Sequence, residues 1–219
     1  VVRDSETAPP SLTVRVCDSV SCSLFGAEAL ISDLQSQFGE VVRIQRVPCV
    51  GRCDEAPVAV VGQHPVGHAN SAKVSACVDQ GQVGPDTPED WVRYDAYRAD
   101  DGYALAMRCQ DDPELAGSII DELDSSGLRG LGGAGFPAGR KWRILNDQPS
   151  PRLMAVNIDE GEPGTFKDRY YLERDPHRFL EGVLIAAQVV GIDSCYLYVR
   201  DEYPGVIEIL NEAIAELKA

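Results

Sequence analysis

The sequence predicts an α/β protein made of two domains joined by a stretch of different character, and three observations support this. Residues 12–80 place short β-branched runs around one amphipathic segment, the pattern of strands and a helix. Residues 81–113 are rich in Gly, Pro and Asp and poor in aliphatic residues, as in a linker. Residues 114–219 alternate helical and strand patterns, which favours a parallel or mixed sheet. Residues 1–11 are polar and are predicted to be a loose tail.

The N-terminal domain is predicted to have the order strand, helix, strand, strand. Leu12–Val16 alternates and is rich in Val and Thr, which predicts a strand that ends at Cys17. Ser23–Phe38 has helical spacing of its apolar residues and is followed by a glycine. Two further strands are predicted at Val41–Val47 and Val58–Val61. This order in so few residues indicates a small thioredoxin-like α/β domain.

The C-terminal domain is predicted to alternate three helices with two strands. The elements expected, in chain order, are a helix at 114–125, a strand at 152–157, a helix at 176–190, a strand at 195–200 and a helix at 206–218.

Composition excludes several classes of function. The formal net charge of −15 argues against nucleic-acid binding, because affinity for phosphate requires clustered Lys and Arg. No stretch approaches the ~20 apolar residues of a membrane-spanning helix. The first residues lack the pattern of a secretion signal, so a cytoplasmic location is expected.

Four of the seven cysteines form a cluster of two pairs, Cys17 with Cys22 and Cys49 with Cys53. Each pair follows a predicted strand, so both could meet at one end of a sheet. Four thiolates can hold a [2Fe–2S] cluster. Structural zinc is the main alternative, although zinc sites usually contain a C-x2-C pair. Two disulfides or a dithiol redox site fit less well with this spacing and compartment. Cys77, Cys109 and Cys195 are interpreted as packing residues.

A glycine-rich loop follows the first helix of the C-terminal domain. Gly130, Gly132 and Gly135 spell G-x-G-x-x-G, but a helix precedes them where a dinucleotide-binding fold needs a strand. The loop could still form a phosphate cradle, because exposed amides and neighbouring cations attract anions. The cations are Arg129, Arg140, Lys141 and Arg143. A flexible surface loop is the alternative interpretation.

Polar side chains follow the strand predicted at 152–157. Asn157 and Asp159 are two residues apart, which places them on one face of an extended backbone. Glu160 and Glu162 follow at a turn containing Pro163. The carboxyl ends of strands in α/β sheets are common places for ligands, so these four residues are candidates for a binding site.

Two sets of motifs carry a family resemblance. CDSVSC and PCVGRCDEAP, within about residues 12–85, resemble the thioredoxin-like [2Fe–2S] ferredoxins, including the small iron–sulfur subunit of complex I. GLRGLGGAGFPAGRKW and NIDEGEPGTFKDRYYLERDPHRFLEG are similar to the flavin-bearing, NADH-oxidising subunit of complex I and its relatives. This second resemblance runs from about Ser126 to Pro204. It implies an α/β domain that binds FMN and NAD(H), of which this chain holds the N-terminal part.

The resemblance also implies roles for individual residues. Cys17, Cys22, Cys49 and Cys53 would hold the [2Fe–2S] cluster. Matching positions in the flavin family imply that Gly130, Gly132 and Lys141 contact FMN and that Asn157 and Asp159 hold the flavin. Phe136 would stack on the nicotinamide nucleotide, and Glu162 and Glu160 would line its pocket. Leu131 stands where relatives often have Arg. A four-cysteine [4Fe–4S] domain is expected beyond Ala219.

The implied function is a diaphorase: hydride exchange between NAD(H) and FMN, then single-electron transfer through iron–sulfur clusters. No general acid or base is required, so no catalytic side chain is predicted. We expect the β subunit of a soluble NAD-dependent formate dehydrogenase, whose partner is a large molybdenum- or tungsten-containing catalytic subunit with further iron–sulfur clusters. A complex I or NAD-reducing hydrogenase diaphorase is an alternative. So are a non-catalytic [2Fe–2S] carrier or docking module and a zinc-stabilised scaffold.

Overall fold

The computed structural model describes residues 8–131 and 134–218. The described chain divides into two compact units. The first unit takes the residues up to Glu89 together with Asp159–Tyr170 and Arg200–Glu208. The second unit takes Asp90–Ile158 and Tyr171–Val199 together with the residues from Ile209 onward. Two segments that are distant in sequence from the N-terminal domain therefore belong to the same compact unit as its cysteines.

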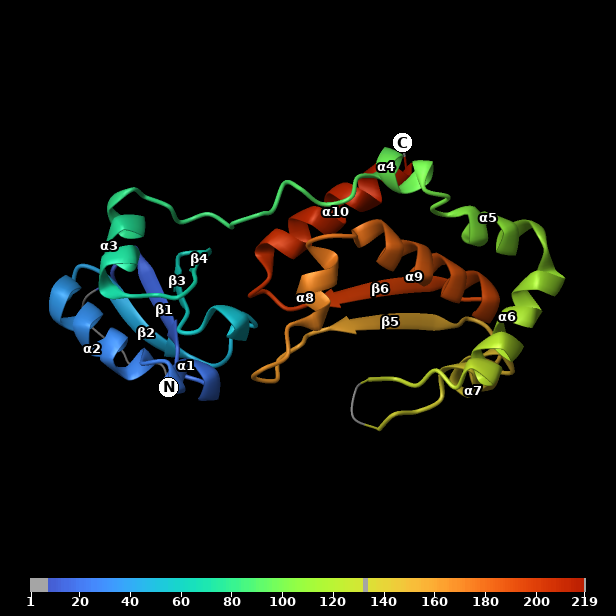
Figure 1. The fold of residues 1–219 in the computed structure, drawn as a ribbon, viewed down its shortest axis with the longest axis horizontal. Helices are drawn as coiled ribbons and strands as arrows, with labels where there is room; N and C mark the ends of the chain where they lie inside the picture. The colour runs from blue at the N-terminus through green and yellow to red at the C-terminus, as the bar shows by residue number, and fades with distance from the viewer. Residues whose placement is uncertain (1–7, 132–133, 219) are drawn as a thin grey trace. The chain divides into compact units, whose positions relative to one another are not determined.

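The first unit is built on a four-stranded sheet with the order β2-β1-β3-β4 (Figure 1). Strands β1 and β2 are parallel, and β3 and β4 continue the sheet antiparallel. The core forms because Val14 and Val16 of β1 and all of β3 are buried. The strands are β1 (Thr13–Cys17), β2 (Arg43–Val47), β3 (Ala59–Val61) and β4 (His64–Val66).

Helices α2 (Ala27–Phe38) and α3 (Ser71–Asp79) pack against this sheet. Helix α2 buries Leu30, Ile31 and Leu34, the apolar face that predicted it. The single helix expected over 23–38 is two helices, because Gly26 takes a φ of +94° between α1 (Val20–Leu24) and α2. Strand β4 was not predicted, since three residues around Pro65 carry little pattern.

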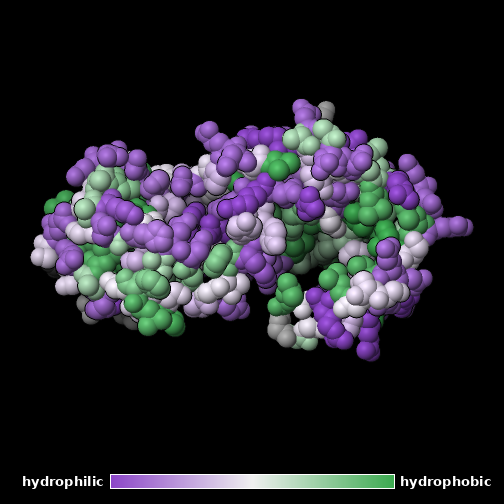
Figure 2. All heavy atoms as spheres, in the orientation of Figure 1, coloured by the Kyte–Doolittle hydropathy of each residue, from purple (hydrophilic) through white to green (hydrophobic). Residues whose placement is uncertain are grey.

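Helix α1 leaves apolar side chains in solvent. Val20, Leu24 and Phe25 are all more than half exposed. Figure 2 shows hydrophobic atoms gathered over this part of the first unit.

The second unit contains a two-stranded parallel sheet, as the alternating pattern predicted. Strand β5 (Leu153–Ile158) pairs with β6 (Ser194–Val199), so that Asn157 lies opposite Tyr198. Leu180 of α9 (Pro176–Val190) packs with Ile209 and Ala213 of α10 (Pro204–Lys218) in one apolar cluster. Asp175 caps α9 by accepting the backbone N–H of Arg178, and Gly191 ends the helix.

Four further helices precede this sheet in the chain: α4 (Tyr94–Ala99), α5 (Ala104–Asp111), α6 (Pro113–Ser126) and α7 (Ala138–Asn146). Helices α4 and α5 lie within residues 81–113, where the sequence predicted a linker without helices. They form because Tyr97, Tyr103 and Ala106 pack into one buried cluster. Helix α7 was missed because it is short, follows the glycine loop directly and begins with Ala138 and Gly139 before three basic residues.

His177 organises the aromatic side chains of the second unit. Its ring is fully buried and lies within hydrogen-bonding distance of two partners, at 2.8 Å from Tyr103 Oη and 2.9 Å from Glu216 Oε2. The rings of Trp91 and Tyr97 lie about 6 Å from it. Among the described residues, no helix is both long enough and apolar enough to cross a bilayer.

Candidate cofactor sites

The four clustered cysteines lie at one edge of the first unit's sheet. Cys17 ends β1, and Cys49 follows β2. Because β1 and β2 are parallel and Cys17 pairs with Val47, both strands deliver their cysteines to the same edge. Cys22 lies in α1 and Cys53 begins the 3₁₀ turn Cys53–Glu55.

The cysteine sulfurs are arranged as two pairs. The Sγ atoms of Cys49 and Cys53 are 3.4 Å apart. A hydrogen bond from Cys22 lowers the pKa of Cys17 to about 6, and the same bond raises the pKa of Cys22 well above its ordinary range. Burial raises the pKa of Cys49 to about 11. Within the described residues, no three His, Cys, Asp or Glu side chains gather as they would around a single metal ion.

This donor set fits a binuclear iron–sulfur cluster, in which each iron takes two cysteine thiolates. Cys17, Cys22 and Cys49 are buried, and Cys53 is partly exposed. Two backbone amides also donate to the sulfurs: Gly51 N–H to Cys49 Sγ at 3.3 Å and Gly164 N–H to Cys53 Sγ at 3.1 Å. Amide donors stabilise the negative charge that sulfur carries in such a cluster.

Residues that sequence reasoning missed surround the loop that carries Cys49 and Cys53. Arg200 donates from Nη2 to the carbonyl of Cys49 at 2.6 Å and from Nη1 to the carbonyl of Glu160 at 2.8 Å. Tyr203 Oη lies 3.3 Å from the carbonyl of Gly51. Both side chains follow β6, whose carboxyl end lies beside that of β5. The sequence could have pointed to Arg200 and Tyr203 through this adjacency, because ligand-contacting residues often follow neighbouring parallel strands.

Glu160 is held by the same network. Its buried carboxylate accepts the backbone N–H of Asp168 at 2.7 Å and that of Arg169 at 3.2 Å, at the start of α8 (Lys167–Leu172). Tyr203 Oη lies 3.1 Å from the same carboxylate. The Glu160 backbone has a positive φ of 42°, a conformation that costs energy in a residue other than glycine. The surrounding contacts hold it there.

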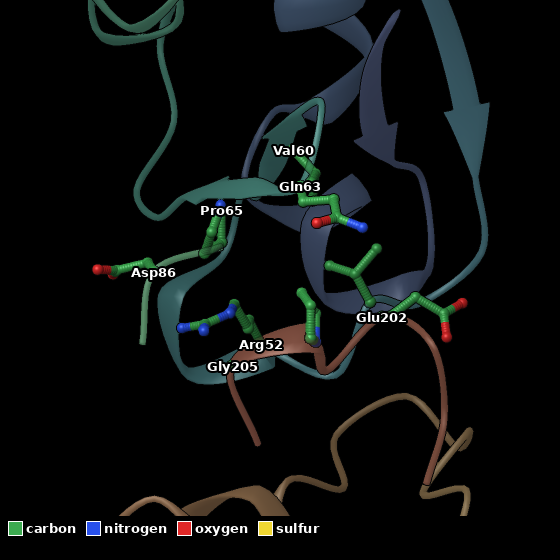
Figure 3. Close-up of a pocket in the computed structure, with 9 residues that line it drawn as sticks. Arg52, Val60, Gln63, Pro65, Asp86, Glu202 and Gly205 are labelled. Atoms are coloured by element: carbon green, nitrogen blue, oxygen red, sulfur yellow. The ribbon is translucent and has the colours of Figure 1, made fainter. Parts of the chain in front are cut away.

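A small cavity of about 20 Å³ lies beside this network in the first unit (Figure 3). Arg52 and Glu202 point in opposite directions at its rim, with Gln63 and Pro65 on the far side. Gly205 closes it by packing against Asp86, whose carbonyl would lie 2.9 Å from any added Cβ. A cavity of this volume is the size of a single water molecule.

The glycine loop begins as a narrow turn in the second unit. Gly130 N–H donates to the carbonyl of Phe136 at 3.0 Å, and the backbones of Arg129 and Pro137 form an isolated antiparallel β-bridge. A Cβ added at Gly135 would meet nothing within 4 Å, so a ligand can approach the backbone there. The predicted contact Gly132 lies outside the described residues. The described part of the loop therefore leaves space for a ligand beside Gly135.

The cations around this loop differ in what lies beside them. Lys141 is exposed on α7, and the guanidinium of Arg140 lies 5.8 Å from the Phe136 ring. Arg143 instead pairs with Asp121 and Asp124 of α6. Gly139 also differs from the loop glycines, because it packs against Asp124 and gives α7 close contact with α6. Arg143 and Gly139 therefore stabilise helix packing.

The polar residues after β5 fall in different units. Asn157 is exposed at the end of β5 in the second unit. Asp159 and Glu162 are exposed in Asp159–Tyr170 of the first unit. Their roles toward a flavin or a nucleotide stay predictions.

Comparison with known protein families gives two matches. Residues 5–82 match the thioredoxin-like [2Fe–2S] ferredoxin family, and residues 123–219 match the Nuo51 FMN-binding domain. Both matches agree with the predicted fold class.

Individual proteins are similar to large parts of the chain. A subunit of the NADH-quinone oxidoreductase of Aquifex aeolicus is 49% identical over 125 residues, which are 57% of this chain and 29% of that protein. The mitochondrial NADH-ubiquinone oxidoreductase 51 kDa subunit of Neurospora crassa is 46% identical over 46% of this chain and 22% of its own length. The chain thus spans less than a third of these relatives.

Solved structures also match almost the whole chain. A chain of the NAD⁺-reducing [NiFe]-hydrogenase in its air-oxidised state superposes with a TM-score of 0.78 and 28% identity. The match covers 97% of this chain and 41% of the hydrogenase chain.

Proposed function

We propose that the chain is a diaphorase, because residues 5–82 match the thioredoxin-like [2Fe–2S] ferredoxin family and residues 123–219 match the Nuo51 FMN-binding domain. The reaction is hydride exchange between NAD(H) and FMN, followed by single-electron transfer through iron–sulfur clusters. FMN, when bound, supplies the step from a two-electron hydride to single electrons. The cysteine arrangement carries the proposal, because two close sulfur pairs at one sheet edge match the donors of a [2Fe–2S] cluster.

The proposed roles of the other residues follow their chemistry. Gly130, which has no side chain, lets FMN approach the loop backbone, while the amide of Gly132 and the ammonium group of Lys141 bind the FMN phosphate. Asn157 and Asp159 orient the flavin by hydrogen bonds. Phe136, whose ring is 45% exposed, provides a face on which the nicotinamide nucleotide can stack. Glu162 and Glu160 border the nucleotide pocket, and the backbone N–H groups of Asp168 and Arg169 hold the Glu160 carboxylate in place.

We further propose that the complex is a soluble, cytoplasmic NAD-dependent formate dehydrogenase, with this chain in its β subunit. Formate would be oxidised on a large molybdenum- or tungsten-containing partner subunit with further iron–sulfur clusters. A [4Fe–4S] cluster beyond residue 219 would connect the two. The presence of the ferredoxin and flavin domains in one chain supports this assembly.

An NAD⁺-reducing hydrogenase is the second candidate complex. The match of 97% of the chain to a hydrogenase chain favours it. The similarity to subunits of NADH-quinone and NADH-ubiquinone oxidoreductases favours complex I equally. These candidates are separated by purification of the native complex followed by addition of formate or of hydrogen. Reduction of the iron–sulfur centres by formate supports the formate dehydrogenase. Reduction only by hydrogen supports the hydrogenase.

The diaphorase proposal is tested by an anaerobic NADH titration of the full chain after reconstitution with iron, sulfide and FMN. Bleaching of the bound flavin, with up to one and a half NADH consumed per FMN because the flavin accepts two electrons and the cluster one, supports the proposal. The Lys141→Ala variant should weaken FMN binding, whereas Lys73→Ala, which removes an exposed lysine of α3, should not. A bound iron–sulfur cluster without FMN binding would instead support a non-catalytic electron carrier.

A further inference from the structure

Two buried arginines hold the backbone of the loop that carries Cys49 and Cys53. Arg200 is 8% exposed and Arg169 is 5% exposed. Buried arginines are rare unless they have specific partners, because the desolvation of a charge is costly. The partners here include backbone carbonyls of the cysteine loop, so both arginines are built into this site.

Arg200 has the more direct contact with a cysteine. Its 2.6 Å hydrogen bond ends on the carbonyl of Cys49 itself, which places the guanidinium beside a proposed cluster ligand. A carboxylate balances it, since Arg200 Nε donates to Glu202 Oε2 at 3.0 Å. Removal of either partner would therefore change the charge beside Cys49 by one unit, in opposite directions.

Arg169 holds the next part of the loop. It donates from Nε to the carbonyl of Gly51 at 3.2 Å and from Nη2 to Asp54 Oδ1 at 2.8 Å. The loop from Cys49 to Asp54 is thus fixed at two carbonyls and one carboxylate. This arrangement orients the amide of Gly51 toward Cys49 Sγ.

Net charge and hydrogen bonds to sulfur are two of the factors that set the reduction potential of an iron–sulfur cluster. Reduction adds one negative charge, so a nearby cation favours the reduced form and a nearby carboxylate favours the oxidised form. These effects are stronger at a buried site, where water screens charges less.

We propose that Arg200 is a positioning residue that raises the reduction potential of the cluster, with Glu202 acting as its opposing charge. The inference rests on the proposed ligands Cys49 and Cys53. It goes beyond the diaphorase function, because it assigns control of the cluster's potential to a residue that follows β6. Arg200 acts through the Cys49 backbone and through its charge.

The test is a redox titration of the cluster in the full chain, monitored by EPR, without nucleotide. Arg200→Gln should lower the midpoint potential and Glu202→Gln should raise it. Arg200→Lys keeps the charge and should fall between wild type and Arg200→Gln. Arg43→Gln is the matched control, since it removes an exposed arginine from β2 of the same unit and should leave the potential unchanged.

A tenfold change in the ratio of reduced to oxidised cluster, which is about 59 mV for a one-electron couple, is the shift expected for Arg200→Gln. If Arg200→Gln shifts the potential no more than Arg43→Gln does, the inference is wrong. If Arg200→Gln fails to retain iron, Glu202→Gln decides, and a potential at or below wild type refutes the inference. A wild-type chain that binds no cluster would instead refute the proposed cysteine ligands.

Discussion

The backbone amide of Gly164 donates a hydrogen bond to Cys53 Sγ at 3.1 Å, although the two residues are 111 positions apart. Cys53 belongs to the ferredoxin match and Gly164 to the FMN-binding match. The segment Asp159–Tyr170 therefore contributes a donor to a predicted cluster ligand. Gly164 adopts a φ of +90°, which glycine tolerates and which turns its amide toward the sulfur.

The cysteine pairs give the first prediction. Cys22→Ser and Cys53→Ser should each lose most of the bound iron and sulfide, because a [2Fe–2S] cluster needs four thiolates. Cys109→Ser is the matched control, since Cys109 is buried in α5 of the second unit. Iron and sulfide assays on anaerobically purified protein provide the measurement. Equal loss of iron in the control would contradict the assignment of ligands.

Gly51→Ala should weaken cluster binding and destabilise the first unit. A Cβ at Gly51 would collide with the Tyr203 ring and hydroxyl, and the residue has a φ of +73°. Positive φ alone costs about 1 kcal/mol in alanine, and the collision adds about 1–3 kcal/mol. Gly81→Ala is the control, because Gly81 has a φ of +64° with open space around it. Urea unfolding and iron content measure the difference, and equal effects of the two substitutions would refute the role of Tyr203.

Much of this organisation followed from local sequence patterns. The strands β1, β2, β3, β5 and β6 and the helices α2, α6, α9 and α10 were expected within a few residues, because each has a clear apolar periodicity. The grouping of the four cysteines was expected because each pair follows a predicted strand, whose ends could meet at one end of the sheet.

The network around Cys49 was not expected, because its members are far apart in the chain. Arg200 and Tyr203 reach the cysteine loop from beyond β6, and Arg169 reaches it from α8. Only the tertiary fold brings them together. The helices α4 and α5 were missed for a related reason, since Tyr97 and Tyr103 stabilise them through packing rather than through helix propensity.

Protonation of Glu216 in acid should lower the stability of the second unit. Burial acts to raise the pKa of this carboxyl, but the Tyr94 amide, His177 and Arg93 outweigh burial and lower it below its ordinary 4.5. A lowered pKa means that the stabilisation is complete above pH 4.5 and is lost as the pH falls through the lowered value. Glu216→Gln should therefore flatten the acid dependence of unfolding. Unfolding is followed by the fluorescence of buried Trp91 in a Trp142→Phe background. If Glu216→Gln leaves the acid dependence of unfolding unchanged, this role of Glu216 is contradicted.

Replacement by alanine at two helical glycines should change the free energy of unfolding in opposite directions. Gly139→Ala should lower the free energy of unfolding by about 1–3 kcal/mol, because its Cβ would lie 2.5 Å from the Asp124 backbone nitrogen. Gly117→Ala should raise it by about 0.5–1 kcal/mol, because Gly117 is exposed inside α6 with open space around it. Thermal and urea unfolding measure both. Equal signs would show that α6 and α7 do not pack as described.

In the proposed diaphorase, electrons from NADH reach a flavin and then the cluster held by the four cysteines. EPR spectroscopy of the reconstituted full chain after anaerobic addition of NADH tests it most directly. Wild type should give the signal of a reduced [2Fe–2S] cluster, and the signal should be much weaker when FMN is omitted. A cluster that dithionite reduces but NADH does not, with FMN bound, would contradict the diaphorase proposal.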